Sequence, residues 1–321
     1  MSRIPIVLLS GFLGSGKTTL LNRLLRDPDF QDTAVVVNEV GAVGVDHALI
    51  ALSREDVILL DGGCICCALK GSLNETLHRL TRSRLEGGTS FRRVIVETSG
   101  LTDPGPVAAA LVADPAFMRD YMLAGVTTLV DAIHFDDQRH VHPEVLMQVG
   151  FADRLLISKA DLSGGEKARH LANELTGLYP SADCRVLASV ADEARLIWID
   201  STGMADRAAR ISRFQAQDVS AGVVTAALNF SGRLRYDDVN DWLDHTMALF
   251  GPDLLRLKGI LQVEEAEAPV ILHGVAGLIY SPGFLPGEAF ENGRNSMVLI
   301  ARGIERPDLE DALVRLAQIA G

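Results

Sequence analysis

A glycine-rich segment near the N-terminus holds the first residues whose types and spacing could do chemistry. Residues 11–18 read GFLGSGKT and match the pattern G-x-x-x-x-G-K-[ST] in full, directly after an apolar run and directly before a helical pattern. In this context backbone N–H groups surround a phosphate, the lysine reaches the outer phosphate oxygens, and the last hydroxyl ligates Mg²⁺. A chance match in a glycine-rich turn is disfavoured by the flanking elements. The expected nucleotide-binding residues are Gly11, Gly14, Ser15, Gly16, Lys17 and Thr18.

A second motif, Ser158-Lys159-Ala160-Asp161, follows a strand-like run late in the same half of the chain. The Asp161 carboxylate offers two acceptors to guanine N1–H and its exocyclic amine, which adenine cannot match, while the Lys159 stem can lie along the ring. The motif therefore favours GTP over ATP, although Ser158 stands where asparagine is usual. The alternative is a solvated Lys159/Asp161 pair with Asp161 as a helix N-cap.

A carboxylate at the end of another apolar run, in Glu97-Thr98-Ser99-Gly100, lies where a nucleotide switch is expected. Glu97 can hold Mg²⁺ directly or through water, and Gly100 can present its N–H to the γ-phosphate. We therefore place Glu97 with Lys17 and Thr18 among the catalytic groups. Thr18 and Glu97 are the expected Mg²⁺ ligands.

Three cysteines, Cys64, Cys66 and Cys67, lie on a predicted loop between the phosphate loop and Glu97. Thiolates suit Zn²⁺, and three from one loop leave a fourth coordination position open or filled from elsewhere. Buried structural cysteines and a redox switch are the alternatives. The fourth cysteine, Cys184, is predicted to be a small buried side chain on a core strand.

If the fourth coordination position is filled, the candidate ligands lie outside the cysteine loop. Glu39 is the preferred one, because Asn38-Glu39 ends a buried strand that points to the same sheet edge as the phosphate loop. The other residues that we considered are Asp61, His47, His134, His140 and His142.

Alternation of apolar runs with helical patterns predicts the elements that position these groups. Continuous rather than alternating hydrophobicity indicates strands covered on both faces, so the fold class is α/β with a mostly parallel sheet. The predicted strands are Ile4–Ser10, Thr33–Asn38, Asp56–Leu60, Arg93–Glu97, Gly125–Asp131, Arg154–Ser158 and Cys184–Ala188. The predicted helices are Lys17–Arg26, Gly71–Arg84, Pro104–Val112, Glu144–Phe151 and Glu166–Leu178.

A charged segment near residues 202–217 interrupts this alternation. We therefore expect a nucleotide-binding domain over residues 1–210 and a smaller α+β domain over residues 218–321. Arg256 and Lys258 of the smaller domain could face the larger domain or a client, or lie on a solvated strand edge. The elements predicted for this domain are strands Gly222–Phe230, Leu255–Val263, Val270–Ile279 and Ser296–Arg302 and helices Asp237–Phe250 and Pro307–Ile319.

Composition excludes several classes of protein. The 321 residues include 30 Lys+Arg and 42 Asp+Glu, a net charge of −12, with no basic run, which argues against nucleic acid as a partner. No apolar stretch approaches the roughly 18 to 20 residues that cross a bilayer. Closely spaced cysteines indicate a reducing compartment, so we expect a cytoplasmic protein.

Together these motifs resemble the CobW-type metallochaperone GTPases of the SIMIBI class of P-loop NTPases. The segments that carry the resemblance, in family order, are GFLGSGKTTLLNRLL, VVVNEVGAVGVD, GGCICC, ETSGLTDPGPV and SKAD, followed by LLRLKGIL and VLIARGI. The resemblance implies that residues 14 to 19, including Thr19, hold phosphates and Mg²⁺, and that Cys64, Cys66 and Cys67 with Glu39 bind the transported metal. Ala42 stands where many relatives carry a second acidic residue, so a secondary metal contact is not expected there. The histidine-rich stretch of some relatives is absent, so large storage capacity is not expected.

The resemblance implies a GTPase that binds Zn²⁺, or a related metal such as Co²⁺, and passes it to a client. Without a recognisable glutamine or arginine finger, unstimulated turnover is expected to be slow, about 10⁻⁴ to 10⁻² s⁻¹, with a client or a second protomer of a homodimer as the stimulus. Alternatives are cobalt supply for cobalamin synthesis, loading of one dedicated metalloenzyme, a non-catalytic metal sensor with a structural nucleotide site, and a small-molecule P-loop kinase.

Overall fold

The structure is a computed structural model, and it describes most of the chain. The described residues are 3–25, 27, 30, 32–38, 57–60, 65–87, 91–179, 181–187, 196–198, 218–219, 223–275, 277–279, 283–284 and 294–320. The chain forms two compact units, Met1–Asn173 with Cys184–Ile199, and Glu174–Asp183 with Asp200–Gly321. The domain boundary predicted at residues 210–217 lies outside the described residues.

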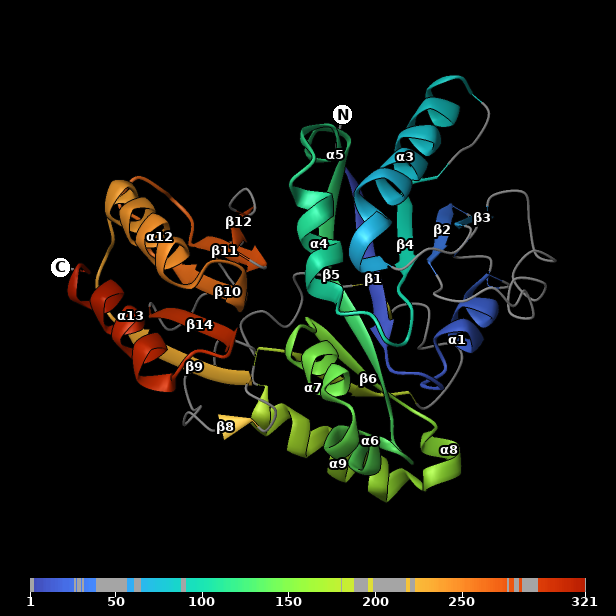
Figure 1. Cartoon of the computed structure of the whole chain (residues 1–321). Coiled ribbons are helices and arrows are strands. Elements are labelled where there is room, and N and C mark those ends of the chain that lie inside the picture. Colours follow the sequence, from blue (N-terminus) through green and yellow to red (C-terminus); the bar gives the residue numbers. More distant parts are fainter. Residues whose placement is uncertain are drawn as a thin grey trace. The chain divides into compact units, whose positions relative to one another are not determined.

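The first unit contains the predicted mostly parallel sheet. Its strand order is β3-β2-β4-β1-β5-β6-β7, and the pairings from β3 to β6 are all parallel (Figure 1). The phosphate loop follows the central strand β1, so the groups that leave the carboxyl ends of β4, β5 and β6 meet it at one edge of the sheet. The strands are β1 Ile4–Gly11, β2 Thr33–Asn38, β3 Val57–Leu60, β4 Arg93–Glu97, β5 Tyr121–Asp131, β6 Arg154–Ser158 and β7 Asp183–Val186.

Continuous apolar runs are buried on both faces of this sheet, as predicted. Four consecutive side chains of β1, from Ile6 to Leu9, are completely buried. On one face, Leu20, Leu21 and Leu24 of helix α1 pack over Val7 and its neighbours. Helices α4 and α7 also contact β1.

Most predicted helices and strands of the first unit are confirmed to within a few residues. The prediction for α3 is wrong at its start, which lies at Ile65 and not at Gly71. Three short helices, α5, α6 and α8, were not predicted because each has seven residues or fewer, too short for a clear apolar period. The helices are α1 Lys17–Leu24, α3 Ile65–Leu85, α4 Pro104–Val112, α5 Pro115–Asp120, α6 Phe135–Val141, α7 Pro143–Gly150, α8 Ala160–Ser163 and α9 Gly165–Leu178.

The second unit contains an antiparallel sheet and two long helices, which confirms its α+β class. Its strand order is β12-β11-β10-β14-β9-β8, with β13 paired to β11. Trp242 of α12 and Leu309 and Leu313 of α13 pack against this sheet. The elements are β8 Asp218–Val219, β9 Val223–Phe230, α12 Tyr236–Phe250, η2 Gly251–Asp253, β10 Leu254–Leu261, β11 Val270–Val275, β12 Leu278–Ile279, β13 Gly283–Phe284, β14 Asn295–Arg302 and α13 Arg306–Gln318.

Two expectations for the second unit are corrected. The run Val270–Ile279 is not one strand, because a turn at Gly277 folds β12 back against β11 as an antiparallel pair. Arg256 does not lie on a solvated edge, since β10 is an inner strand between β11 and β14 and Arg256 is only 2% exposed.

Among the described residues, no helix combines the length and the apolar character needed to cross a membrane.

Candidate functional site

The phosphate loop connects the buried strand β1 to helix α1. Gly11 has φ +141°, and a Cβ atom there would lie 2.6 Å from the carbonyl oxygen of Leu129, so this position requires glycine. Lys17 is buried, and its Nζ donates hydrogen bonds to the carbonyls of Gly11 at 2.7 Å and Phe12 at 3.2 Å. The lysine ammonium is therefore held within the loop that the motif predicted.

Thr18 and Glu97 meet beside this loop, although 79 positions separate them in sequence. The Thr18 hydroxyl donates to Glu97 Oε1 at 3.1 Å. Glu97 ends β4 and lies opposite Leu9 of β1 in the parallel register, and it is only 2% exposed. A hydroxyl and a carboxylate at this spacing are the oxygen donors that Mg²⁺ prefers.

A tight turn follows Glu97 and packs on the phosphate loop. The Thr102 N–H donates to the Ser99 carbonyl at 3.0 Å, which closes a turn around Gly100 and Leu101. A Cβ atom on Gly100 would lie 2.7 Å from the backbone nitrogen of Leu13. Only glycine permits this close approach of the turn, Ser99–Thr102, to the phosphate loop.

The Ser158–Asp161 motif also reaches the phosphate loop. The Ser158 hydroxyl donates to the Ser15 carbonyl at 2.7 Å and lies 3.1 Å from the Val130 carbonyl oxygen. This hydrogen bond joins the two loops directly, with serine in the place where asparagine is usual.

Lys159, the next residue of the motif, is held by Asp131, which the sequence analysis did not identify. Lys159 has φ +57°, the one positive φ of a non-glycine among the described residues, and its Nζ donates to Asp131 Oδ2 at 2.7 Å. Asp131 also accepts hydrogen bonds from His134 Nδ1 at 2.9 Å and from the Ile133 N–H at 2.8 Å. Burial by itself raises the pKa of the Asp131 carboxyl, but these three hydrogen bonds outweigh it and hold the pKa below its ordinary value.

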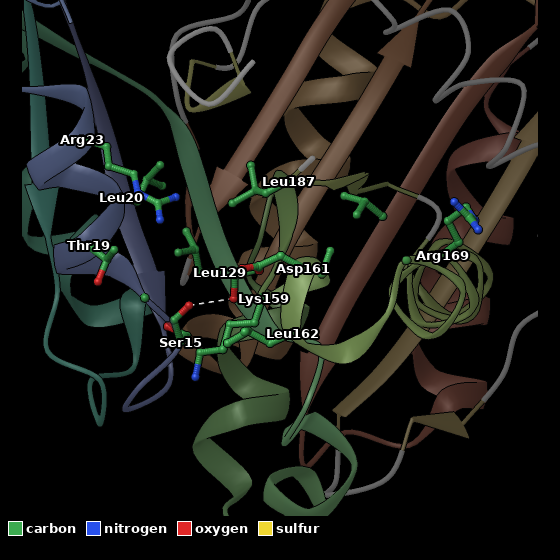
Figure 2. A pocket seen from close by; sticks show the side chains of 15 residues that line it. Ser15, Thr19, Leu20, Arg23, Leu129, Lys159, Asp161, Leu162, Arg169 and Leu187 are labelled. Atoms are coloured by element: carbon green, nitrogen blue, oxygen red, sulfur yellow. Dashed lines mark hydrogen bonds between the residues drawn. The ribbon is translucent and has the colours of Figure 1, made fainter. Parts of the chain in front are cut away.

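The phosphate loop and the Ser158–Asp161 motif both contribute to the lining of a pocket of about 820 Å³. Figure 2 shows Ser15 across from Lys159, with Thr19, Leu20 and Arg23 contributed by α1 and Arg169 by α9. Its volume lies in the ordinary range for a small-molecule site. The full lining is Ser15, Gly16, Thr19, Leu20, Arg23, Leu129, Ser158, Lys159, Ala160, Asp161, Leu162, Gly165, Arg169, Val186 and Leu187.

Asp161 lies in this pocket lining, but it is not the helix N-cap that the alternative reading required. The N-cap residue of α8 is Lys159, and Asp161 lies within the first turn.

The structure changes the expected location of the cysteines. Cys66 and Cys67 lie in the first turn of α3, not on a loop, because this helix begins directly after Cys64. Cys64 and Glu39 lie outside the described residues, as do Asp61 and His47. Cys184 is on β7 as predicted, but it is half-buried and not fully buried.

Two of the histidines considered as metal ligands make other contacts, and His140 is exposed on α6. His134 pairs with Asp131, and the ring of His142 lies 4.7 Å from that of Phe12 in the phosphate loop. Within the described part of the chain, no group of three or more His, Cys, Asp and Glu side chains is arranged to hold a metal ion.

Two polar residues near the site, Asp131 and Gln148, had signals in the sequence that were not used. Asp131 is the last residue of a buried strand, at the same edge as Glu97. Gln148 is an isolated amide within the apolar helix α7, and its side chain donates to the turn Ser99–Thr102. A polar group placed among apolar neighbours is informative because its burial requires hydrogen bonds.

A phosphate loop between β1 and α1, hydrogen-bonded to the loop Ser158–Asp161 (the base-side loop) at the carboxyl edge of a parallel sheet, defines a P-loop nucleotide-binding protein. The comparisons with known families narrow this class. Residues 5–186 match the CobW/HypB/UreG nucleotide-binding domain, and residues 223–317 match the cobalamin synthesis protein CobW C-terminal domain. The chain belongs to the CobW/HypB/UreG family, as the sequence analysis predicted.

Several relatives resemble the chain over different lengths. The zinc chaperone YjiA of Escherichia coli is 30% identical over 313 residues, 97% of each chain. The zinc-regulated GTPase metalloprotein activator 1 of Schizosaccharomyces pombe is 32% identical over 170 residues, which are 51% of this chain and 40% of that relative. The crystal structure of Zn(II)-bound YjiA GTPase superimposes with a TM-score of 0.70 at 23% identity, covering 98% of this chain and 99% of that one, which shows the same fold.

Proposed function

We propose that this protein is a cytoplasmic GTPase that binds Zn²⁺ at Cys64, Cys66 and Cys67 and delivers it to a client protein. The observation that carries the proposal is the hydrogen bond from Thr18 to the buried Glu97, because it places a hydroxyl and a carboxylate beside the phosphate loop. The names of YjiA and of the fission yeast activator, a zinc chaperone and a GTPase, support the choice of metal and nucleotide.

In this proposal the nucleotide spans the pocket from the phosphate loop to the base-side loop. The phosphates lie on the N–H groups of Gly14 to Thr19, and Lys17 exchanges its two carbonyl contacts for phosphate oxygens. Thr18 and Glu97 hold Mg²⁺, which supplies charge neutralisation to the phosphates when it is bound. Lys159 and Asp161 read guanine, and Gly100 senses the γ-phosphate.

Coupling between nucleotide and transported metal is the central step of this proposal. Cys66 and Cys67 follow strand β3, and Glu97 ends β4, which is separated from β3 only by β2. Because parallel strands end at one edge of the sheet, the cysteine motif and the Mg²⁺ ligands lie on elements that leave the same edge. GTP binding would then assemble the thiolate site, and hydrolysis would loosen it beside a client, with a reciprocal coupling of about 1–3 kcal/mol.

A metal titration in three nucleotide states tests this proposal. The reduced protein is titrated with Zn²⁺, and separately with Co²⁺, against a chromophoric chelator, first alone, then with GDP, then with Mg²⁺ and a non-hydrolysable GTP analogue. We expect one equivalent of metal to bind about tenfold or more tightly in the presence of the analogue, a coupling of about 1.4 kcal/mol. Equal affinity in all three states would refute nucleotide-gated delivery.

Two substitutions make the titration specific. Cys66→Ser should weaken metal binding and remove its nucleotide dependence, whereas Cys184→Ser, a matched change on β7, should leave both unchanged. Hydrolysis of GTP above a Lys17→Ala control would exclude a non-catalytic metal sensor. The comparison of Zn²⁺ with Co²⁺ distinguishes zinc delivery from cobalt supply.

A further inference from the structure

Gln148 is an amide side chain buried in an apolar helix. It lies on α7, is only 1% exposed, and has the buried apolar neighbours Met147 and Val149. Because a buried amide loses its hydration, it must recover that free energy through hydrogen bonds within the protein.

Both amide protons of Gln148 are donated to the turn Ser99–Thr102. Nε2 lies 3.0 Å from the carbonyl oxygen of Gly100 and 3.0 Å from that of Thr102. Because both neighbours are acceptors, the NH₂ end of the amide must face them, which settles the orientation of the group. Among the described residues Oε1 has no hydrogen-bond partner. An apolar side chain of equal length would fill this space without that unsatisfied oxygen, but it would remove the two hydrogen bonds that the turn carbonyls accept. Glutamine is therefore better explained by its contacts with the turn than by packing.

The turn is held between Gln148 and the phosphate loop. On one side its Gly100 and Thr102 carbonyls accept from Gln148, and on the other side Gly100 lies against Leu13. Within the turn, the Ser99 carbonyl accepts from the Thr102 N–H at 3.0 Å. Because the C=O and N–H of one trans peptide point in opposite directions, this bond sets the direction of the Gly100 N–H.

The helix that carries Gln148 is itself anchored to the central sheet. Thr128 of β5 donates its hydroxyl to the Gln148 backbone carbonyl at 3.1 Å, and both groups are buried. Helix α7 also packs on β1 and β5. Helix α7 therefore holds the Gln148 side chain in place relative to the sheet, so that its hydrogen bonds can position the turn.

We infer that Gln148 is a positioning residue that holds the turn Ser99–Thr102 in the arrangement that senses the γ-phosphate. This inference rests on the proposed GTPase function. GTP carries the γ-phosphate that the turn meets, whereas GDP does not. Removal of the amide should therefore weaken binding of GTP and leave binding of GDP unchanged.

The test compares the affinities of two nucleotides in matched variants. Gln148→Met keeps the length and burial of the side chain and removes both donors, while Gln148→Glu keeps its shape and places an acceptor against two carbonyls. Thr127→Val is the control, since it removes a buried hydrogen bond from the neighbouring residue of β5 to the Ile197 carbonyl and leaves the printed contacts of Gln148 and of the turn in place. Dissociation constants for GDP and for a non-hydrolysable GTP analogue with Mg²⁺ are measured with a fluorescent nucleotide, together with the urea unfolding midpoint.

We expect the ratio of GTP-analogue to GDP affinity to fall about tenfold in the Gln148 variants, which corresponds to loss of about 1.4 kcal/mol, and to stay at the wild-type value in Thr127→Val. An unchanged ratio in a folded Gln148 variant, or an equal loss of both affinities, overturns the inference. If neither variant folds, hydrogen exchange on the wild-type protein decides. When the analogue replaces GDP, the hydrogen-exchange protection of the peptides covering residues 99–103 and 145–150 must change together. A change in the protection of only one peptide overturns the inference. Failure of the proposed function is distinct, since the wild-type protein would then bind neither nucleotide.

Discussion

Replacement of Asp131 by asparagine should weaken guanine nucleotide binding without any direct contact with the nucleotide. The carboxylate accepts a hydrogen bond from the Lys159 ammonium at 2.7 Å, and its side chain is only 2% exposed. Asparagine keeps the size of the side chain and an acceptor for the Ile133 N–H. However, its NH₂ group or a neutral oxygen would face the ammonium, so the charge-assisted hydrogen bond is lost.

The expected magnitude follows from the backbone of Lys159. Its φ of +57° costs a non-glycine residue about 1–2 kcal/mol, and a hydrogen bond to a charged group contributes about 1.5–3 kcal/mol, enough to offset that strain. Without this bond the strain is unopposed, and the left-handed conformation falls to about one sixth to one thirtieth of the molecules. Because apparent affinity scales with the competent fraction, GDP should bind about 6- to 30-fold more weakly.

Titration with a fluorescent GDP analogue measures this effect. The matched control is Asp136→Asn in the neighbouring helix α6, which changes an exposed carboxylate paired with Arg139 and should leave the affinity for GDP unchanged. A GDP affinity in Asp131→Asn equal to that of the wild type, with the free energy of unfolding lowered, would show that Asp131 stabilises the fold and does not set the base-side loop.

Three further predictions concern the magnesium ligands, the turn and the acid stability. Glu97→Gln keeps an acceptor for Thr18 but removes the negative charge, so the Mg²⁺ concentration needed for half-maximal binding of the GTP analogue should rise about tenfold or more. An unchanged midpoint in a Mg²⁺ titration would contradict the role of Glu97 as a Mg²⁺ ligand. In urea unfolding, Gly100→Ala should lower the free energy of unfolding by about 1–3 kcal/mol, because the added Cβ would lie 2.7 Å from the Leu13 backbone nitrogen. Gly177→Ala in α9, where no atom lies within 4 Å of the added Cβ, should be neutral or stabilising in the same experiment. The lowered pKa of Asp131 contributes stability that is present above its unfolded-state pKa of about 3.9 and is lost as the pH falls through its lower folded-state pKa. The difference in unfolding free energy between wild type and Asp131→Asn should therefore shrink below about pH 4. A difference that does not depend on pH would contradict this assignment.

The sequence was sufficient to predict the sheet and the residues that follow its strands. Buried parallel strands give continuous apolar runs, and the motif after each run lies at the same edge, which is why Lys17, Glu97 and Asp161 could be related before any geometry was known. The start of α3 was harder to predict from the sequence, because its first two turns contain two cysteines and a glycine and therefore show only a weak helical pattern of apolar residues.

Contacts between side chains could not be predicted in the same way. The sequence contains Asp131, Ser158 and Gln148, but only the folded chain specifies that they meet Lys159, the Ser15 carbonyl and the turn Ser99–Thr102. Such partners depend on the register of neighbouring strands and on helix placement, which local propensity does not determine.

The hydrogen bond between Ser158 and the Ser15 carbonyl has a consequence for the order of folding. It joins residues 143 positions apart, so the two sides of the pocket meet only after β1, β5 and β6 have assembled. Contacts of such long sequence separation form slowly, because a large loop must close first. During synthesis, the phosphate loop and the cysteine motif emerge long before residue 158, and the pocket cannot be complete at that stage. A nucleotide bound across the whole pocket therefore stabilises only the assembled sheet, and its binding marks the end of folding of the first unit.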